Sequence, residues 1–130
     1  MSVAAFAPET PTLVLASSDR APGQARRFIS EHFRALGVAD DFVGRLVVTE
    51  LVTNAHRHVG IGLIVVRVLL DEPERAVRLE VWDEGDALPV VRPENPDATG
   101  GRGLPLIIGL VRAWGVRPLY ETGKVVWCAL

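Results

Sequence analysis

The sequence predicts an α+β fold, a two-layer α/β sandwich in which helices cover one face of a mixed or antiparallel sheet. Two segments in its first half repeat apolar residues at helical spacing, and pairs of short β-branched segments follow them. Together they give the order β-α-α-β-β-loop-α-β-β. The length of 130 residues suits one domain, which we place at residues 12–130 after a short tail at 1–11.

Two helices are expected in the first half. Residues 22–36 begin with a proline, which suits a first helical turn, and end before Gly37, a natural C-cap. A second helix begins at Asp40 or Asp41, either of which can cap it, and runs to about His58. Both helices carry apolar residues on one side only, which indicates that each covers a core.

Short apolar and β-branched segments predict the strands. Residues 63–70 and 76–83 flank an Asp-Glu-Pro-Glu turn and read as two antiparallel strands. An apolar run at 104–114 predicts a third helix. The complete set of predicted strands is 12–16, 63–70, 76–83, 119–120 and 124–130.

Glycine and proline are unevenly distributed. The chain contains 12 Gly and 9 Pro, and twelve of these residues lie in the segment from Asp83 to Gly123. Residues 86–100 have no sustained period and contain three prolines, so we predict a loop there. A loop of about 15 residues is longer than a compact domain usually holds without a function.

Composition excludes several classes of protein. The formal charge of −2 gives no basic surface for direct nucleic-acid binding. The single Cys128 excludes an internal disulfide or a multi-cysteine zinc site and suits a reducing compartment. The N-terminus does not read as a signal peptide, and no apolar run approaches the roughly 20 residues of a membrane span. We therefore expect a cytoplasmic protein without membrane association.

Three polar residues lie along one border of the second helix. Glu50, Asn54 and His58 are spaced four residues apart, beside an apolar stripe of Val47, Val48, Leu51, Ala55 and Val59. A carboxylate and a carboxamide one turn apart can both point at one metal ion or ligand. The alternative interpretation is an ordinary amphipathic boundary.

Two further segments suggest ligand binding. Asp83 ends a predicted strand and Gly85 follows closely, so the acid could accept a hydrogen bond from an exocyclic amine; the alternative is a plain Asp-x-Gly turn. The segment 100–103, Gly-Gly-Arg-Gly, comes just before the third helix, where N–H groups and the helix dipole attract anions. Its alternative is a flexible hinge. Neither a P-loop nor a G-x-G-x-x-G motif is present.

Taken in order, these segments resemble the motifs of one superfamily. Residues 50–55 resemble the N box, 83–85 the first glycine box and 101–104 the second glycine box. This is the pattern of the gyrase, histidine-kinase and mismatch-repair ATPases, which have a Bergerat-type nucleotide fold. The short single-domain form is similar to the bacterial anti-sigma-factor serine kinases. The resemblance extends from about Leu13 to Leu130.

The resemblance implies a role for each motif. Asn54 would ligate Mg²⁺, Glu50 would be the general base for the acceptor hydroxyl, and His58 would lie near the phosphates. Asp83 would bind the adenine amino group, with Gly85 allowing the base to approach. Residues 86–100 would be the ATP lid. The residues that would hold the phosphates are Gly101, Arg102, Gly103 and Leu104.

The function implied by this resemblance is that of a Mg-ATP-binding serine/threonine kinase. Its expected partners are an anti-sigma antagonist protein and a sigma factor, and the first strand and helix would pair two copies into a homodimer. An ATP-binding interaction module without kinase activity is the alternative. Asp86 favours that alternative, as does Val125, where many relatives carry threonine. A structural interaction protein without a nucleotide is the third interpretation.

Overall fold

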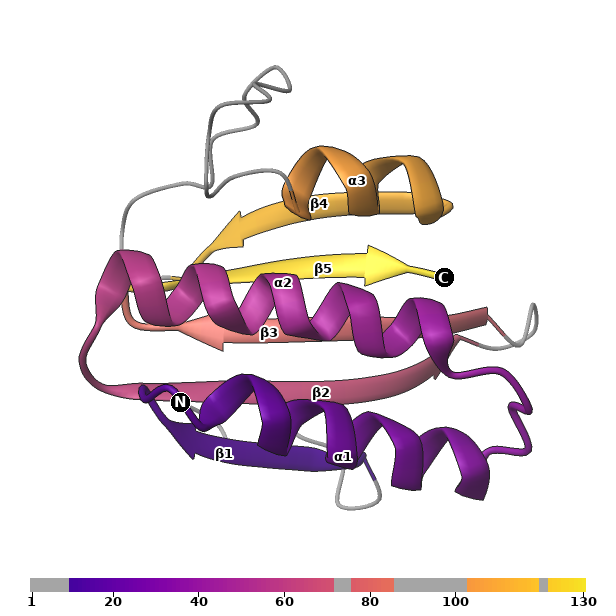
Figure 1. Cartoon of the computed structure of the whole chain (residues 1–130). Helices are drawn as coiled ribbons and strands as arrows, with labels where there is room; N and C mark the ends of the chain where they lie inside the picture. The colour runs from indigo at the N-terminus through magenta and orange to yellow at the C-terminus, as the bar shows by residue number, and fades with distance from the viewer. Residues whose placement is uncertain (1–9, 72–75, 86–102, 120–121) are drawn as a thin grey trace.

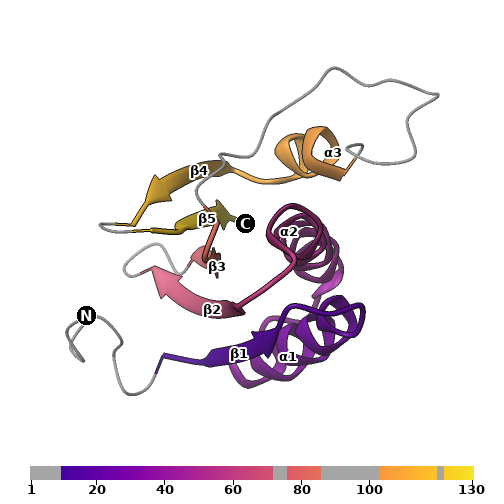
Figure 2. The same cartoon turned by 90° about the vertical axis from the view of Figure 1, so that its left-hand side faces the viewer.

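A five-stranded sheet forms one layer of the computed structural model, and helices lie along one of its faces (Figures 1 and 2). The structure describes residues 10–71, 76–85, 103–119 and 122–130. The elements of this part of the chain are β1 (Thr12–Ala16), α1 (Ala21–Ala35), α2 (Phe42–Val59), β2 (Leu63–Asp71), β3 (Ala76–Asp83), α3 (Gly103–Leu110), β4 (Ala113–Pro118) and β5 (Lys124–Ala129). The predicted α+β sandwich is confirmed.

The strand order is β1-β2-β3-β5-β4, and every neighbouring pair is antiparallel. Of the two predicted arrangements, mixed or antiparallel, the described sheet is the antiparallel one. β3 is the central strand, so its last residues emerge in the middle of one sheet edge. β1 and β4 are the two outermost strands of the sheet.

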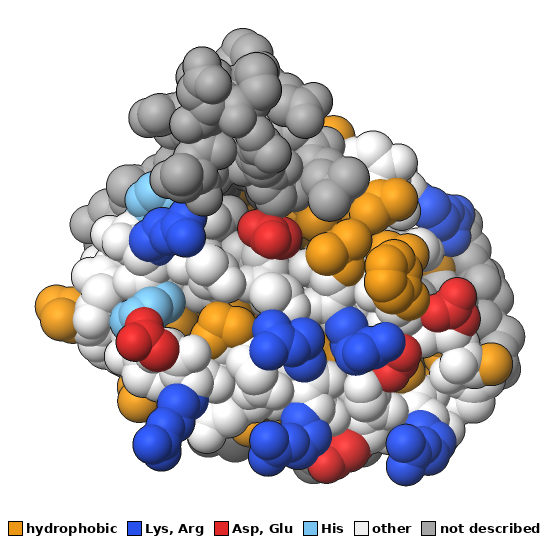
Figure 3. Space-filling model, viewed as in Figure 1, with side chains coloured by type: hydrophobic (Ala, Val, Ile, Leu, Met, Phe, Trp, Pro, Cys, Tyr) orange, Lys and Arg blue, Asp and Glu red, His pale blue; other side chains and the backbone are white. Residues whose placement is uncertain are grey.

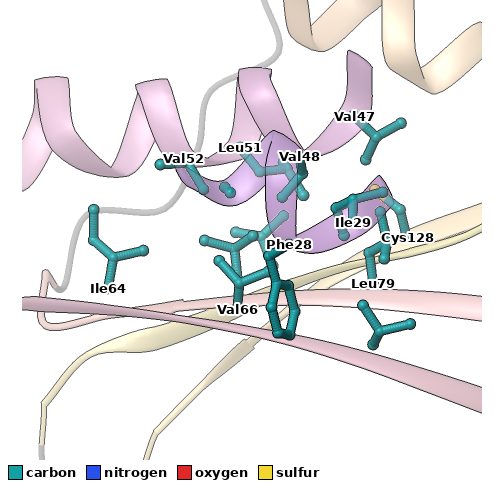
Figure 4. Close-up of a cluster of buried hydrophobic side chains, with 14 of the residues drawn as sticks. Phe28, Ile29, Val47, Val48, Leu51, Val52, Ile64, Val66, Leu79 and Cys128 are labelled. Atoms are coloured by element: carbon teal, nitrogen blue, oxygen red, sulfur yellow. The ribbon is translucent and has the colours of Figure 1, made fainter. Parts of the chain in front are cut away.

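The core lies between the sheet and the helices. In Figure 4, side chains from α1 and α2 project toward β2, β3 and β5. The predicted apolar stripe of α2 is confirmed at Val47, Val48, Leu51 and Ala55, and Val52, which we did not include, is also fully buried. Burying this many apolar side chains is the main favourable contribution to folding. It also fixes which side of α2 faces away from the sheet.

Local signals place the ends of the first two helices as expected. α1 ends at Ala35, and Gly37 follows in the left-handed conformation at φ 77°. Asp40 accepts the backbone N–H of Phe42 through Oδ1 at 2.9 Å, so it satisfies one of the free donors at the start of α2. Gly60, at φ 76°, ends α2.

The third helix is shorter than predicted. It ends at Leu110 instead of continuing to Trp114, which lies in β4. The N–H of Arg112 already bonds the carbonyl oxygen of Ala129 at 2.8 Å, so pairing with β5 takes over where the apolar run would have continued the helix. The strand predicted at 119–120 is accordingly found at 113–118, and Tyr120 lies outside the described residues. An apolar run of this length fits either a helix or a buried strand.

None of the helices described here is long and apolar enough to cross a membrane.

Candidate functional site

Three chain segments meet at one edge of the sheet. In Figure 1 the end of α2, the end of β3 and the start of β5 all lie at the left, and α3 begins on the same side. Figure 2 shows α2 between α1 and α3. The end of α2 and the end of β3 therefore lie next to each other, whereas Glu50 and Asn54 lie earlier on α2. The third segment ends at the start of α3.

Asp83 is the most buried acid of this edge. Its side chain is 4% exposed and that of Lys124 is 6% exposed, and Lys124 Nζ donates to Asp83 Oδ1 at 2.9 Å. The backbone N–H of Gly85 donates to the same oxygen at 2.9 Å. A buried carboxylate needs such compensation because removing a charge from water is costly. Asp83 is therefore held in one orientation.

The position of Lys124 bears on what the resemblance implies for Val125. We expected Val125 to stand where many relatives carry a threonine whose hydroxyl helps Asp83 to bind adenine. In the structure Lys124 is the register partner of Asp83, whereas Val125 pairs with Trp82. Successive strand residues face opposite sides of a sheet, so Val125 is buried on the side away from α2. Sequence analysis missed Lys124 because the pairing of β3 with β5 was not known.

Gly85 has a structural reason to be glycine. A Cβ there would lie 2.5 Å from Val59 Cγ2, on the last residue of α2. Real carbon atoms do not approach so closely, so a larger residue would push the end of α2 away from β3. Within the described residues, the close approach predicted at Gly85 is thus made by the side chain of Val59.

The polar border of α2 lies as predicted. Glu50 and Asn54 are both half-buried and one helical turn apart, and His58 is exposed in the last turn.

Seen from the helix side in Figure 3, basic side chains gather over α1 and hydrophobic ones over α3. The exposed arginines of α1 include Arg26, Arg27 and Arg34.

The remaining predicted residues are described only in part or not at all. Gly103 is the first residue of α3 and Leu104 the second. Gly101 and Arg102 lie outside the described residues, as does the predicted lid at 86–100. Among the residues that are described, no three His, Cys, Asp or Glu side chains are grouped so that they could hold a metal ion. Asn54 remains the predicted Mg²⁺ ligand.

A Ser-His-Asp chain occurs on the other side of α2. Ser17 Oγ lies 2.7 Å from His56 Nδ1, and His56 Nε2 lies 3.3 Å from Asp19 Oδ1. Asp19 is fully exposed, and the backbone N–H of Ser17 already donates to Gly62 O at 3.3 Å. These contacts connect the turn after β1 to α2, and we assign them a structural role.

The fold and this edge together define the class of protein. A five-stranded antiparallel sheet with helices on one face, and an acid at the end of its central strand, is consistent with a Bergerat-type fold. The family model of the histidine kinase-like ATPase domain matches residues 15–129, and the chain belongs to this family. No curated protein matches the sequence. Membership confirms the predicted superfamily and implies ATP as the ligand, typically with Mg²⁺.

Proposed function

We propose that this protein is a cytoplasmic Mg-ATP-binding serine/threonine kinase that regulates transcription by phosphorylating an anti-sigma antagonist protein. Its further proposed partners are a sigma factor and a second copy of the chain. The observation that carries the proposal is the placement of Glu50 and Asn54 one turn apart on α2, whose last residue packs beside Asp83 and Gly85. The proposal thus assigns the catalytic and metal-binding groups to α2 and the base-binding group to the end of β3, which the last residue of α2 approaches.

The proposed chemistry needs little from the protein beyond positioning and charge neutralisation. The oxygen of the acceptor serine attacks the γ-phosphorus, the bond to the β-phosphate oxygen breaks, and ADP leaves. Glu50 takes the proton of the serine hydroxyl. Asn54 offers its amide oxygen to Mg²⁺, which neutralises phosphate charge when bound, and amide oxygens are suitable ligands for this cation.

The base end of the site is the part with the most defined geometry. Asp83 would accept a hydrogen bond from the exocyclic amine of adenine. Lys124 and the N–H of Gly85 keep its carboxylate in place. A preorganised acceptor loses less freedom on binding than a mobile one, so this arrangement favours affinity. The phosphates would be held by the predicted residues Gly101, Arg102, Gly103 and Leu104.

The test has two stages. Calorimetry with Mg-ATP first asks whether the nucleotide binds, and Asp83→Asn should weaken binding. Radiolabelled ATP and a purified candidate antagonist protein then test transfer to serine, which Glu50→Gln should abolish while ATP still binds. Glu31→Gln, an exposed acid on α1, is the matched control and should transfer at the wild-type rate. Equal labelling by Glu50→Gln would overturn the assignment of the base.

The second candidate function, an ATP-binding interaction module, is favoured by Asp86, an acid that follows Asp83 and Glu84 in the sequence and would repel phosphates if it faced them. It predicts that ATP binds but that no serine is labelled on the antagonist protein.

A further inference from the structure

The sequence contains 14 lysine and arginine residues, and Lys124 is the one lysine among them. It is also buried, whereas lysine is almost never fully buried unless it is paired. An ammonium is a compact charge with three donors, and arginine has a wide planar fork instead. The only lysine of the chain therefore places a compact ammonium, with three N–H donors, against the carboxylate of Asp83.

The hydrogen bonds around this pair leave capacity on both partners. Asp83 Oδ1 receives Lys124 Nζ and the Gly85 N–H, and within the described residues no hydrogen bond reaches Oδ2. Lys124 Nζ uses one of its three protons on Asp83. The pair thus has a further acceptor, Oδ2, and further N–H donors on Nζ to offer to a ligand.

Both groups lie directly next to Gly85. The position of a Cβ on Gly85 would be 3.4 Å from Asp83 Oδ1 and 3.6 Å from Lys124 Nζ. The segment 83–85 is where the proposed function places the nucleotide base. Lys124 consequently lies at the base end of the site, and not at the phosphate end where cationic side chains are usually needed.

We propose that Lys124 is a base-reading residue: its ammonium donates to the ring nitrogen N1 of adenine while Asp83 Oδ2 accepts from the neighbouring exocyclic amine. A donor and an acceptor at adjacent positions match the amine and N1 along that edge of the base. This inference rests on the proposed ATP binding and goes beyond it. A lysine that only neutralised Asp83 would be indifferent to whether the base carries a nitrogen at position 1.

The decisive experiment compares ATP with 1-deaza-ATP, which has C–H in place of N1, by calorimetry. Wild-type protein should bind the deaza analogue about 10-fold more weakly, since a hydrogen bond to a charged donor is lost. Lys124→Met should bind the two nucleotides with similar affinity. Lys124→Gln, which keeps an N–H donor, should retain part of the preference. Equal binding by wild type, or an undiminished preference in Lys124→Met, would overturn the proposal.

A second readout needs no variant. With ¹⁵Nζ-labelled lysine, the folded protein should give one side-chain ammonium resonance, which ATP should shift and 1-deaza-ATP should shift much less. Identical shifts with both nucleotides would contradict the contact to N1. Failure of wild type to bind ATP at all would instead remove the proposed function, so the two failures are distinguishable. Circular dichroism checks that each variant is folded.

Discussion

The side-chain carboxylate of Glu84 accepts the backbone N–H of Leu63 through Oε2 at 2.6 Å. This bond joins the end of β3 to the start of β2, beyond the last paired residues of the two strands. Gly62, at φ 80°, has no Cβ to occupy the space that the carboxylate fills. The residue next to Asp83 therefore fixes the turn between α2 and β2.

We expect Glu84→Ala to lower the free energy of unfolding by about 1 kcal/mol, because the N–H of Leu63 loses its partner. Glu84→Gln keeps an acceptor oxygen and should lose less. Urea denaturation measures both, with the exposed Glu31→Ala as a control for loss of an acid. Equal stability of Glu84→Ala and wild type would show that water replaces the carboxylate without cost.

Gly44 lies at a close contact between α2 and α1. A Cβ on Gly44 would lie 2.7 Å from the ring of Phe33, which is itself buried. Gly44→Ala should therefore destabilise the protein by about 1–3 kcal/mol, although alanine favours helix formation. Gly109→Ala in α3 is the matched control, because within the described residues no atom beyond its chain neighbours and its own helix backbone lies within 4 Å of a Cβ there. It should be neutral or stabilising, and thermal unfolding distinguishes the two outcomes.

The elements predicted well are those with strong local signals. α1 and α2 have a cap or a glycine at an end and many apolar residues at one spacing, so their sequences leave few alternatives. The run 104–114 is apolar almost throughout, so its spacing does not distinguish a helix from a buried strand. Its change from helix to strand near Arg112 depends on pairing with β5, a long-range contact that a local pattern does not contain.

The same limit applies to the candidate site. Glu50 and Asn54 could be found from helical spacing, and Asp83 from its place at a strand end. Lys124 could not be found in this way, because it reaches Asp83 only through the pairing of β3 with β5, 41 residues apart. The isolated lysine in an arginine-rich chain was a signal that the motif comparison did not use.

Asn54 offers a test of the predicted Mg²⁺ site. Asn54→Ala should weaken ATP binding about 10-fold or more when Mg²⁺ is present, because the cation loses its protein ligand. Without Mg²⁺, the affinity for ATP should be nearly that of wild type. Thr53→Ala, the preceding residue on α2, is the matched control. Calorimetry with and without Mg²⁺ checks this, and an equal loss under both conditions would argue against a metal-binding role.

The buried thiol of Cys128 gives a prediction about pH. Burial raises the pKa of Cys128 from its ordinary value of 9.0 to about 12, so the folded protein keeps the thiol protonated where the unfolded chain ionises it. The unfolded state then binds fewer protons, and stability falls as the pH rises from 9 toward 12. At pH 10.5 this contribution lowers the free energy of unfolding by about 2 kcal/mol relative to pH 8. Cys128→Ala, although less stable overall, should lack this part of the decline. Urea denaturation of both proteins at the two pH values measures the difference, and parallel declines would contradict the assignment to Cys128.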